Sequence, residues 1–352
     1  MDLCRFSNLK SLDGPILVTG HTGFKGTWLT MLLAEIGVEV HGLSLPPEKD
    51  SMYERLDRIE KIPEVFLDIN DRIEILKYLL DLKPSVLIHM AAQPLVGQSY
   101  IEPVETFMTN VMGTAHILDA ALQTKSVKVV GVVTTDKVYE NLETNLNFQE
   151  TNPLGGKDPY SASKVGTEQA INAWRQVSSL NSGPAILSFR AGNVIGGGDY
   201  APSRLLPDII KGLQFGKKIA IRNPDSSRPW QHVLDPLFGY LLAIEKALSD
   251  AKNETYNFGP EAGSLTVAEV TKIVIASYPK VEFDIQNLTI EDTFPEAINL
   301  GLNSSKARQL LGWNPKWTQE AAILATLKWW DNTGSKELSR KTIDEIRLRL
   351  AN

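Results

Sequence analysis

The stretch VTGHTGFKG at residues 18–26 decides the fold of this chain. It follows the apolar run Ile16–Thr19 and leads into the amphipathic run Gly26–Ile36, so it joins a predicted strand to a predicted helix. Glycine suits such a joint because the chain turns tightly, its backbone approaches a pyrophosphate closely, and the helix packs near the strand. The first turn of the helix also offers free N–H groups to an anion. The three glycines of this predicted dinucleotide loop are Gly20, Gly23 and Gly26.

Beyond this loop, the first half of the chain alternates short apolar runs with longer amphipathic ones. Further strands are predicted at Val38–Leu43, Val65–Leu67, Ser85–Met90, Val127–Thr134 and Ala185–Phe189. Further helices are predicted at Arg72–Leu82, Pro103–Gln123 and Tyr160–Ser178. Strands that are apolar on both faces and separated by helices indicate a parallel sheet covered on both sides. The predicted fold class is therefore α/β, a doubly wound Rossmann sheet with ligands at the carboxyl ends of its strands.

After Arg190 the pattern loosens, and glycine and proline become frequent. We predict two domains, a dinucleotide-binding Rossmann domain over residues 1–190 and a smaller mixed α/β lobe over 191–352, with a return to the sheet near 230–260. Helices of this part are predicted at Leu205–Phe215, Pro236–Leu248, Val267–Ser277, Lys306–Leu311, Glu320–Trp330 and Glu337–Leu350. The last of them is expected to pack on its own body; docking on a neighbouring subunit is the alternative. The tryptophans near the C-terminus are expected in the core.

Composition excludes several classes of function. The net charge of −6 argues against broad nucleic-acid binding. Cys4 is the single cysteine, so no disulfide forms within the chain, and the five histidines lack ligand-like spacing, so no metal is expected. No apolar stretch is long enough to span a membrane, and the polar N-terminal residues contain no signal-peptide core. A cytoplasmic protein is expected.

The second predicted strand bears on which dinucleotide binds. An acidic residue that usually holds the adenine ribose is absent there, and Ser44 can hydrogen-bond a ribose hydroxyl instead. No arginine follows to neutralise a 2′-phosphate, which favours NAD over NADP. Lys25 either contacts the pyrophosphate or is an ordinary solvated charge. Asp68 and Ile69 either contact the adenine or, in the case of Asp68, cap the next helix.

Tyr160 and Lys164 are four residues apart, on one face of a predicted helix. A phenol with a pKa near 10 is a poor base at neutral pH, and a neighbouring ammonium lowers that pKa. The pair can then take a proton from an alcohol while hydride leaves to a nicotinamide. The sequence therefore predicts an oxidisable alcohol as substrate.

Thr135, Asp136 and Lys137 follow the fifth predicted strand, at the edge where ligands bind. A hydroxyl there can hydrogen-bond the reacting oxygen. An elimination needs one group to remove a carbon-bound proton and another to protonate the departing hydroxyl, which Lys137 and Asp136 can supply. The alternative is a turn that carries a solvated ion pair.

Several motifs together resemble the extended short-chain dehydrogenases/reductases, over nearly the whole chain. They are VTGHTGFKG (18–26), TTDKVY (134–139), DPYSASK (158–164), RAGNVIGGGD (190–199) and IRNPDSSRPWQHVLDP (221–236). Within that family the chain resembles the nucleotide-sugar dehydratases and epimerases. Relatives that act on dTDP-glucose generally carry an acidic residue where Lys137 stands. At this position the chain instead resembles the branch of 4,6-dehydratases that acts on CDP-glucose.

The resemblance implies a reaction and its catalytic residues. Tyr160, helped by Thr135 and Lys164, takes the proton of the sugar 4-hydroxyl while C4 is oxidised by NAD. Lys137 removes the C5 proton, Asp136 protonates the departing 6-hydroxyl, and hydride returns to C6. This scheme needs a lowered pKa at Lys137 and a raised pKa at Asp136, and site closure over the sugar is our hypothesis for both shifts.

The predicted cofactor contacts are Gly20, His21, Thr22, Gly23, Phe24, Lys25, Gly26, Ser44, Asp68, Ile69, Ala91, Ala92, Tyr160 and Lys164. The predicted substrate contacts are Gln93, Thr135, Asn193, Arg204, Arg222, Arg228 and His232. The arginines are included because guanidinium binds phosphate bidentately. His232 is expected to be structural or a substrate contact rather than a general base. The resemblance also implies a homodimer or homotetramer and a role in deoxysugar biosynthesis for lipopolysaccharide O-antigen.

Three interpretations stay open at this point. The first is a 4,6-dehydratase acting on CDP-glucose or on a dTDP-, GDP- or UDP-linked sugar. The second is a nucleotide-sugar 4-epimerase, which would use Tyr160, Lys164 and Thr135 but would not need Asp136 and Lys137 as an acid–base pair. The third is a non-catalytic dinucleotide sensor or scaffold, a class that tends to lose the tyrosine or the lysine.

Overall fold

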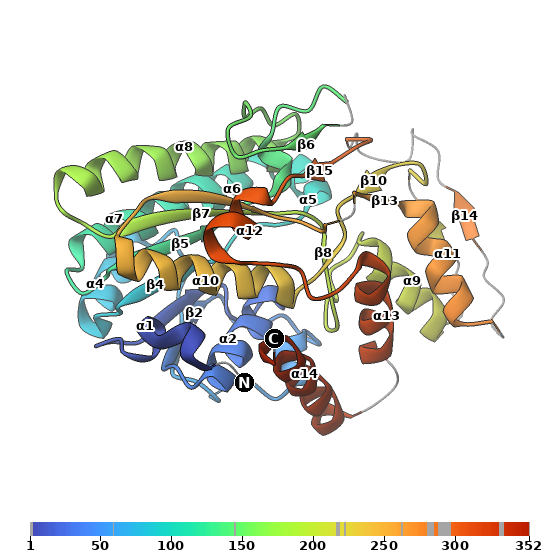
Figure 1. The fold of residues 1–352 in the computed structure, drawn as a ribbon, viewed down its shortest axis with the longest axis horizontal. Coiled ribbons are helices and arrows are strands. Elements are labelled where there is room, and N and C mark those ends of the chain that lie inside the picture. The colour runs from blue at the N-terminus through green and yellow to red at the C-terminus, as the bar shows by residue number, and fades with distance from the viewer. Residues whose placement is uncertain are drawn as a thin grey trace.

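The structure is a computed structural model (Figure 1). It describes residues 3–58, 60–143, 146–215, 219–221, 223–261, 263–279, 285–287, 297–330 and 334–351. A seven-stranded sheet with helices on both faces forms one end, and a smaller lobe that contains α9, α11 and α13 forms the other (Figure 1). The predicted α/β class is confirmed.

The central sheet has the strand order β12-β7-β5-β4-β1-β2-β3, and each neighbouring pair is parallel. The strands are β1 (Ile16–Thr19), β2 (Val40–Ser44), β3 (Glu64–Phe66), β4 (Val86–His89), β5 (Val129–Val133), β7 (Ala185–Ala191) and β12 (Glu254–Phe258). The chain moves outward from β1 to β3 and then turns back through β4 in the other direction. The order therefore reverses between β1 and β4, which places the ligand crevice at their carboxyl ends.

Two sets of helices cover the two faces of the sheet, because successive strand residues point to opposite sides. On one face, β1 residues Ile16 and Val18 share a core cluster with α2 (Phe24–Ile36) and α10 (Leu234–Asp250). On the other face, Leu17 lies in a cluster with α4 (Arg72–Leu82), α7 (Thr114–Gln123) and α8 (Pro159–Leu180). Short elements complete this part: η1 (Leu3–Phe6), α1 (Ser7–Lys10), α3 (Met52–Arg55), α5 (Val96–Ile101) and η3 (Asp136–Val138).

The long helix predicted at Pro103–Gln123 is present but not regular. It consists of α6 (Pro103–Phe107), a π-helical turn η2 (Met108–Gly113) and α7. Asn110 lies buried in that turn, and its side chain donates to Ser163 Oγ of α8 at 2.9 Å. Its Oδ1 accepts from the backbone N–H of Gln93 at 2.8 Å. The π turn thus joins α8 to the loop after β4, near the crevice.

Residues after 191 contribute α9, α11 and α13 to the smaller lobe and also return to the sheet. Helices of this part are α9 (Leu205–Phe215), α11 (Val267–Ser277), α12 (Ser305–Leu311) and α13 (Gln319–Trp330). Short strand pairs are β8 (Val194–Ile195) with β11 (Gln231–His232), β9 (Ile219–Ile221) with β14 (Ile285–Asn287), β10 (Ser227–Arg228) with β13 (Leu265–Thr266), and β6 (Asn147–Phe148) with β15 (Gly301–Leu302). Within this part of the chain, α10 packs on a face of the central sheet, and β12 adds a strand to the sheet beside β7.

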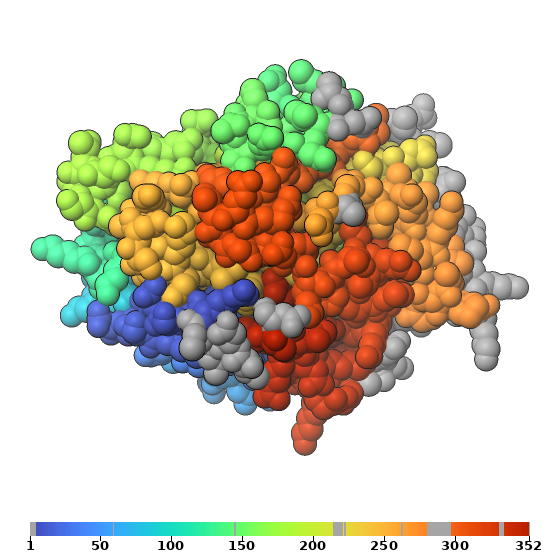
Figure 2. Space-filling view, viewed as in Figure 1, coloured from blue at the N-terminus to red at the C-terminus, as the bar shows by residue number. Residues whose placement is uncertain are grey.

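The C-terminal helix α14 (Ser335–Leu350) packs on its own chain, as expected. Arg347 forms an ion pair with Glu35 of α2 at 2.8 Å, and Arg349 Nε lies 3.2 Å from Asp235 at the start of α10. Residues from the C-terminal third of the chain, in orange and red, form much of one face of the molecule (Figure 2). The helix therefore bridges the dinucleotide-loop helix and the element that returns to the sheet.

Candidate active site

The glycine loop between β1 and α2 has the shape that the sequence predicts. Gly20 has a φ of +71°, and a Cβ there would lie 2.7 Å from the Ala91 backbone nitrogen. A Cβ on Gly26 would overlap the carbonyl oxygen of Gly20. A Cβ on Gly23, in contrast, would meet only that oxygen, at 3.4 Å. Gly20 and Gly26 therefore allow close backbone packing, while Gly23 leaves space in front of the first turn of α2.

Two side chains of the loop attach it to the neighbouring strands. His21 is fully buried, and its Nε2 lies 2.8 Å from Glu64 Oε2 on β3. The Thr22 hydroxyl is hydrogen-bonded to the Ser44 hydroxyl at the end of β2. Any contact of His21 with a cofactor would thus come from its backbone, and the Ser44 hydroxyl already has a partner within the chain.

Lys25 is directed into the crevice rather than fully into solvent. Its Nζ donates to the Tyr240 hydroxyl at 2.9 Å and lies 5.1 Å from the centre of that ring. Burial, followed by the nearby charge of Lys164, lowers the pKa of Lys25 to about 7, while Asp136 opposes the shift. Of the two interpretations of Lys25, its half-buried position near Lys164 and Asp136 fits a pyrophosphate contact better than a solvated charge.

Tyr160 lies at the start of α8, where Asp158 caps the helix and Pro159 occupies its first turn. Tyr160 is buried and hydrogen-bonded to Thr135, and its burial raises its pKa to about 12. Lys164 donates from Nζ to the carbonyl of Val133 at 3.0 Å. Burial lowers the pKa of Lys164 to about 8, opposed by Glu168. The predicted phenol–threonine contact is present, but burial outweighs any acidification of the phenol.

Asp136 is fully buried directly after Thr135, whose hydroxyl donates to Asp136 Oδ1 at 3.0 Å. Its Oδ2 is buried without a hydrogen-bond partner. Burial raises the pKa of Asp136, and the charge of Lys137 opposes this shift. Burial by the fold itself thus accounts for the direction of this shift, which does not need site closure over a sugar. Lys137 is half-buried beside it.

Two of the predicted substrate arginines lie close enough for their charges to affect the pKa values of other predicted site residues. Arg204, held by Asp199 Oδ2 at 2.7 Å, is close enough to affect the pKa values of Lys25 and Tyr160. Arg228 is buried, donates to the Ser227 carbonyl at 2.8 Å, and affects the pKa of Asp136. Asn193 lies between β7 and β8, and its carbonyl accepts from Gln231 N–H. Arg222 lies outside the described residues.

Gln93 and His232 already have partners within the fold. Gln93 Nε2 donates to Thr106 Oγ1 at 2.9 Å. His232 is fully enclosed, with Nε2 3.1 Å from Glu345 and its ring centre 4.2 Å from that of Trp317. The structural interpretation of His232 therefore agrees better with its position than a substrate contact does.

At the predicted adenine side, Ile69 is buried against Gly113, while Asp68 is exposed. Asp68 Oδ1 accepts from Asn70 N–H at 2.9 Å, and Asp71, not Asp68, caps α4 through Glu74 N–H. The helix-cap alternative for Asp68 is therefore wrong. Phe24, the first residue of α2, and Ala92, on the loop after β4, are both half-buried.

Sequence reasoning missed the buried pair behind this cluster, Glu168 and Arg190. The two are joined by Arg190 Nη2 to Glu168 Oε2 at 2.9 Å, and the Thr134 hydroxyl donates to Glu168 Oε1 at 2.7 Å. A signal was available, because Glu168 follows Lys164 by four residues and so continues the same helix face.

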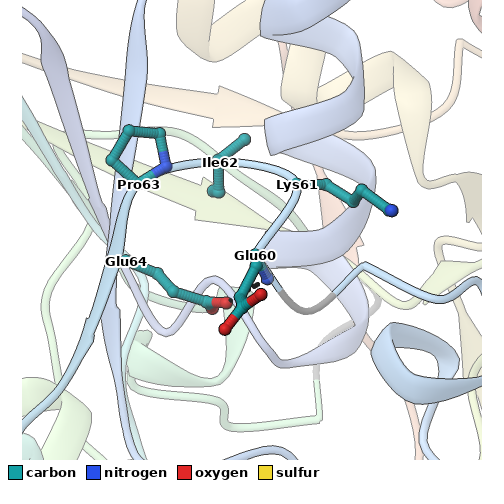
Figure 3. A pocket seen from close by; sticks show the side chains of 5 residues that line it. All are labelled: Glu60, Lys61, Ile62, Pro63 and Glu64. Atoms are coloured by element: carbon teal, nitrogen blue, oxygen red, sulfur yellow. Dashed lines mark hydrogen bonds between the residues drawn. The ribbon is translucent and has the colours of Figure 1, made fainter.

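Three further features of the described residues concern surface hollows, metal ligands and membrane spans. One surface hollow is lined by Glu60–Glu64, where the Glu60 N–H donates to Glu64 Oε1 at 2.7 Å (Figure 3). Within the described ranges, no group of three or more histidine, cysteine and carboxylate side chains could hold a metal. No helix in those ranges is both long and apolar enough to cross a membrane.

Comparison with known proteins gives matches over most of the chain. Residues 17–326 match the family model described as GDP-mannose 4,6 dehydratase. A CDP-glucose 4,6-dehydratase of Salmonella typhimurium is 39% identical over 325 residues, with 89% of each chain covered. A dTDP-glucose 4,6-dehydratase of Escherichia coli is 26% identical over 359 residues, which cover 94% of this chain and 96% of the relative.

Solved structures share the fold. A dTDP-glucose 4,6-dehydratase of Streptomyces venezuelae with NAD and DAU bound has a TM-score of 0.79 at 23% identity, covering 90% of this chain and 97% of its own. A UDP-glucose 4-epimerase of Thermotoga maritima with UDP-glucose has a TM-score of 0.78 at 23% identity, covering 94% and 99%. The same architecture thus occurs in enzymes of two reaction types.

Proposed function

This chain belongs to the GDP-mannose 4,6-dehydratase family, and on that premise we propose that it is an NAD-dependent nucleotide-sugar 4,6-dehydratase whose substrate is CDP-glucose. The observation that carries the proposal is the position of Asp136. It is a buried carboxyl group, with its pKa raised by that burial, directly beside the Thr135–Tyr160 hydrogen bond. A carboxyl group with a raised pKa thus lies beside the tyrosine and threonine that would act in the oxidation, as an oxidation followed by loss of water requires.

The glycine loop fits a dinucleotide. Gly20 and Gly26 bring the loop close to β4 and α2, and Gly23 leaves space in front of the helix N-terminus for the pyrophosphate. Lys25 would add a positive charge at this position, and Ser44 lies at the ribose end. When bound, NAD supplies the chemistry that the side chains lack, by accepting hydride from C4 of the sugar and returning it to C6.

The chain's own residues move the protons. Tyr160 takes the proton of the 4-hydroxyl, with Thr135 hydrogen-bonded to it and Lys164 one turn further along α8. The resulting 4-ketone acidifies the C5 hydrogen, which Lys137 removes. Asp136 then protonates the departing 6-hydroxyl, so one water leaves. Lys137 returns its proton to C5 as hydride reaches C6, and the product is a CDP-4-keto-6-deoxyglucose.

The choice of substrate rests on two features. The resemblance associates a lysine at position 137 with the CDP-glucose branch, and the Salmonella typhimurium relative named for CDP-glucose is 39% identical. Arg204 and Arg228, whose charges reach the cluster, would hold the diphosphate. We assign the cofactor to residues 1–190 and the nucleotide sugar mainly to residues 191–352.

The deciding experiment offers the purified protein CDP-, dTDP-, GDP- and UDP-glucose, each with and without added NAD. We expect a 4-keto-6-deoxy product, detected by its absorbance in alkali, with CDP-glucose as the preferred substrate. A preference for another nucleotide would overturn the CDP assignment only. Formation of a 4-epimer without loss of water would overturn the dehydratase assignment in favour of the epimerase seen among the structural relatives.

We also propose that the enzyme is a cytoplasmic homo-oligomer in deoxysugar biosynthesis for lipopolysaccharide O-antigen. Large apolar side chains are exposed along α5, α6 and η2 and at the end of α8, and a second copy of the chain would cover them. They are Ile101, Val104, Phe107, Met108, Met112, Val177 and Leu180. Light scattering should give a dimer or tetramer, and a monomeric Val104→Glu variant would identify the face. A monomeric wild-type protein would contradict the proposal.

A further inference from the structure

Glu168 is a fully buried carboxylate behind the candidate active site, one helical turn beyond Lys164. Its Oε1 accepts hydrogen bonds from Thr134 Oγ1 at 2.7 Å, from Ser188 Oγ at 2.6 Å and from Arg190 Nε at 2.9 Å. Its Oε2 accepts from Arg190 Nη2 at 2.9 Å. The carboxylate therefore joins α8 to the carboxyl ends of both β5 and β7, with all its partners in place.

This carboxylate is one of two links between α8 and the end of β5. Lys164 Nζ donates to the Val133 carbonyl, and the next residue, Thr134, donates to Glu168. The helix that carries Tyr160 and Lys164 is therefore held at two successive positions of the chain, directly before Thr135 and Asp136.

Arg190 connects the same carboxylate to the other end of that segment. Its Nη1 donates to the Tyr139 hydroxyl at 3.0 Å and to the Glu150 carbonyl at 3.2 Å. The Tyr139 hydroxyl in turn donates to Asn257 Oδ1 on β12 at 2.6 Å. Thr134 and Tyr139, both tied to the Glu168–Arg190 pair, thus bracket the residues Thr135–Lys137.

We propose that Glu168 and Arg190 are positioning residues that hold the acid–base segment Thr135–Lys137 in register with Tyr160 and Lys164, so that oxidation and water loss take place in one rigid site. The inference rests on the dehydratase function proposed above. Neither residue contacts the reacting atoms. Both act through the chain segments that they join. Such residues behind a site hold the side chains that react in a precise geometry.

The pair also sets the charge near Lys164. The charge of Glu168 acts on Lys164, and the charge of Lys164 acts in turn on Lys25 of the glycine loop and on His89 of β4. Burial, followed by the charge of Lys164, lowers the pKa of His89 to about 3, so His89 is neutral near pH 7. Among the described groups with a resolved influence on Lys164, Glu168 is the one that raises its pKa against burial.

Two variants separate position from charge. Thr134→Val removes one hydrogen bond to Glu168 and keeps every charge, whereas Glu168→Gln keeps the shape and removes the charge. Glu245→Gln is the matched control, because that carboxylate accepts backbone N–H groups of α1 in a remote part of the fold. All are assayed as full-length enzyme with NAD and CDP-glucose, and folding is checked by thermal unfolding.

We expect Thr134→Val to lower kcat about tenfold with KM unchanged, because the bond acts on geometry rather than binding. A larger share of the cofactor should stay reduced during turnover, visible at 340 nm, because water loss lags behind oxidation when the segment shifts. A KM change alone, or wild-type absorbance, would overturn the positioning role.

For Glu168→Gln we expect the alkaline limb of the kcat profile to move to lower pH by about one unit. The carboxylate no longer supports the charge of Lys164, and Arg190 becomes an unbalanced cation nearby. An unmoved limb would overturn the electrostatic part. If this variant does not fold, Arg190→Lys replaces it, because it keeps the charge but loses the bidentate geometry. Arg190→Lys should lower kcat without moving the alkaline limb. An unchanged kcat would overturn the inference. Absence of product with the wild-type enzyme would instead signal failure of the proposed function.

Discussion

The glycine loop and the segment Thr135–Lys137 lie at the same edge of the sheet, but they are held in place by opposite means. The loop depends on missing side chains, since a Cβ at Gly20 or Gly26 would collide with backbone atoms. The segment depends on buried polar side chains, with Asp136 inside the protein and its flanking residues tied to Glu168 and Arg190. The close backbone packing at Gly20 and Gly26 involves no titratable group, whereas the chemistry of the segment depends on protonation.

The largest effect is expected at Lys137. Lys137→Ala removes the proposed base for the C5 proton, so the rate of product formation should fall by about 10²- to 10⁴-fold. Oxidation at C4 uses Tyr160 and should remain detectable as reduced cofactor at 340 nm. Lys125→Ala, on an exposed surface, serves as control and should behave as wild type. Full turnover by Lys137→Ala would remove the acid–base assignment of the segment.

The second test concerns the steric character of the loop. Gly26→Ala should lower the free energy of unfolding by about 3 kcal/mol, because its Cβ would overlap the backbone of Gly20. Gly23→Ala has room for its Cβ and a φ of −73°, so its stability should change by less than about 1 kcal/mol. It should nevertheless weaken NAD binding, measured by calorimetry, since the methyl group enters the space before α2. Equal stability losses in the two variants would contradict this account.

The third test concerns protonation at Asp136 rather than steric packing. Burial raises its pKa, so the folded chain holds the proton more tightly than the unfolded chain does. The stability that this supplies is present below the ordinary pKa of about 4 and is lost as the pH rises through the raised value.

Asp136→Asn avoids that loss because it cannot ionise. We expect the variant to be inactive yet more stable than wild type at pH 8 by on the order of 1 kcal/mol, with the difference vanishing near pH 4. Chemical denaturation at several pH values measures this. Asp81→Asn, an exposed substitution, should show no such trend. A pH-independent difference for Asp136→Asn would show that burial does not control its protonation.

The smallest effect is expected from Ser44→Ala. It removes one hydroxyl contact with Thr22, which keeps a second hydrogen bond to the Leu45 carbonyl at 3.2 Å. The free energy of unfolding, measured by thermal unfolding, should change by less than about 1 kcal/mol. A loss as large as that of Gly26→Ala would mean that side-chain bonds, and not backbone packing, hold the loop.

Prediction from the sequence succeeded where short-range patterns suffice. β1 and α4 have the predicted bounds, and α8 differs from its prediction by a few residues at its ends. In the helix at Pro103–Gln123 the periodicity was present, but the π turn at η2 was not foreseen. That turn depends on where Asn110 finds its partners, 17 residues away at Gln93 and 53 residues away at Ser163.

By itself, the sequence determined the doubly wound sheet, the glycine loop and the spacing of Tyr160 and Lys164, because hydrophobic periodicity and four-residue spacing are local properties of the chain. Only the tertiary structure decided that Asp136 is buried, that His232 is enclosed against Glu345, and that Glu168 pairs with Arg190. Burial and the Glu168–Arg190 pair depend on residues distant in sequence, and burial is the largest influence on the pKa values of Asp136 and Lys164.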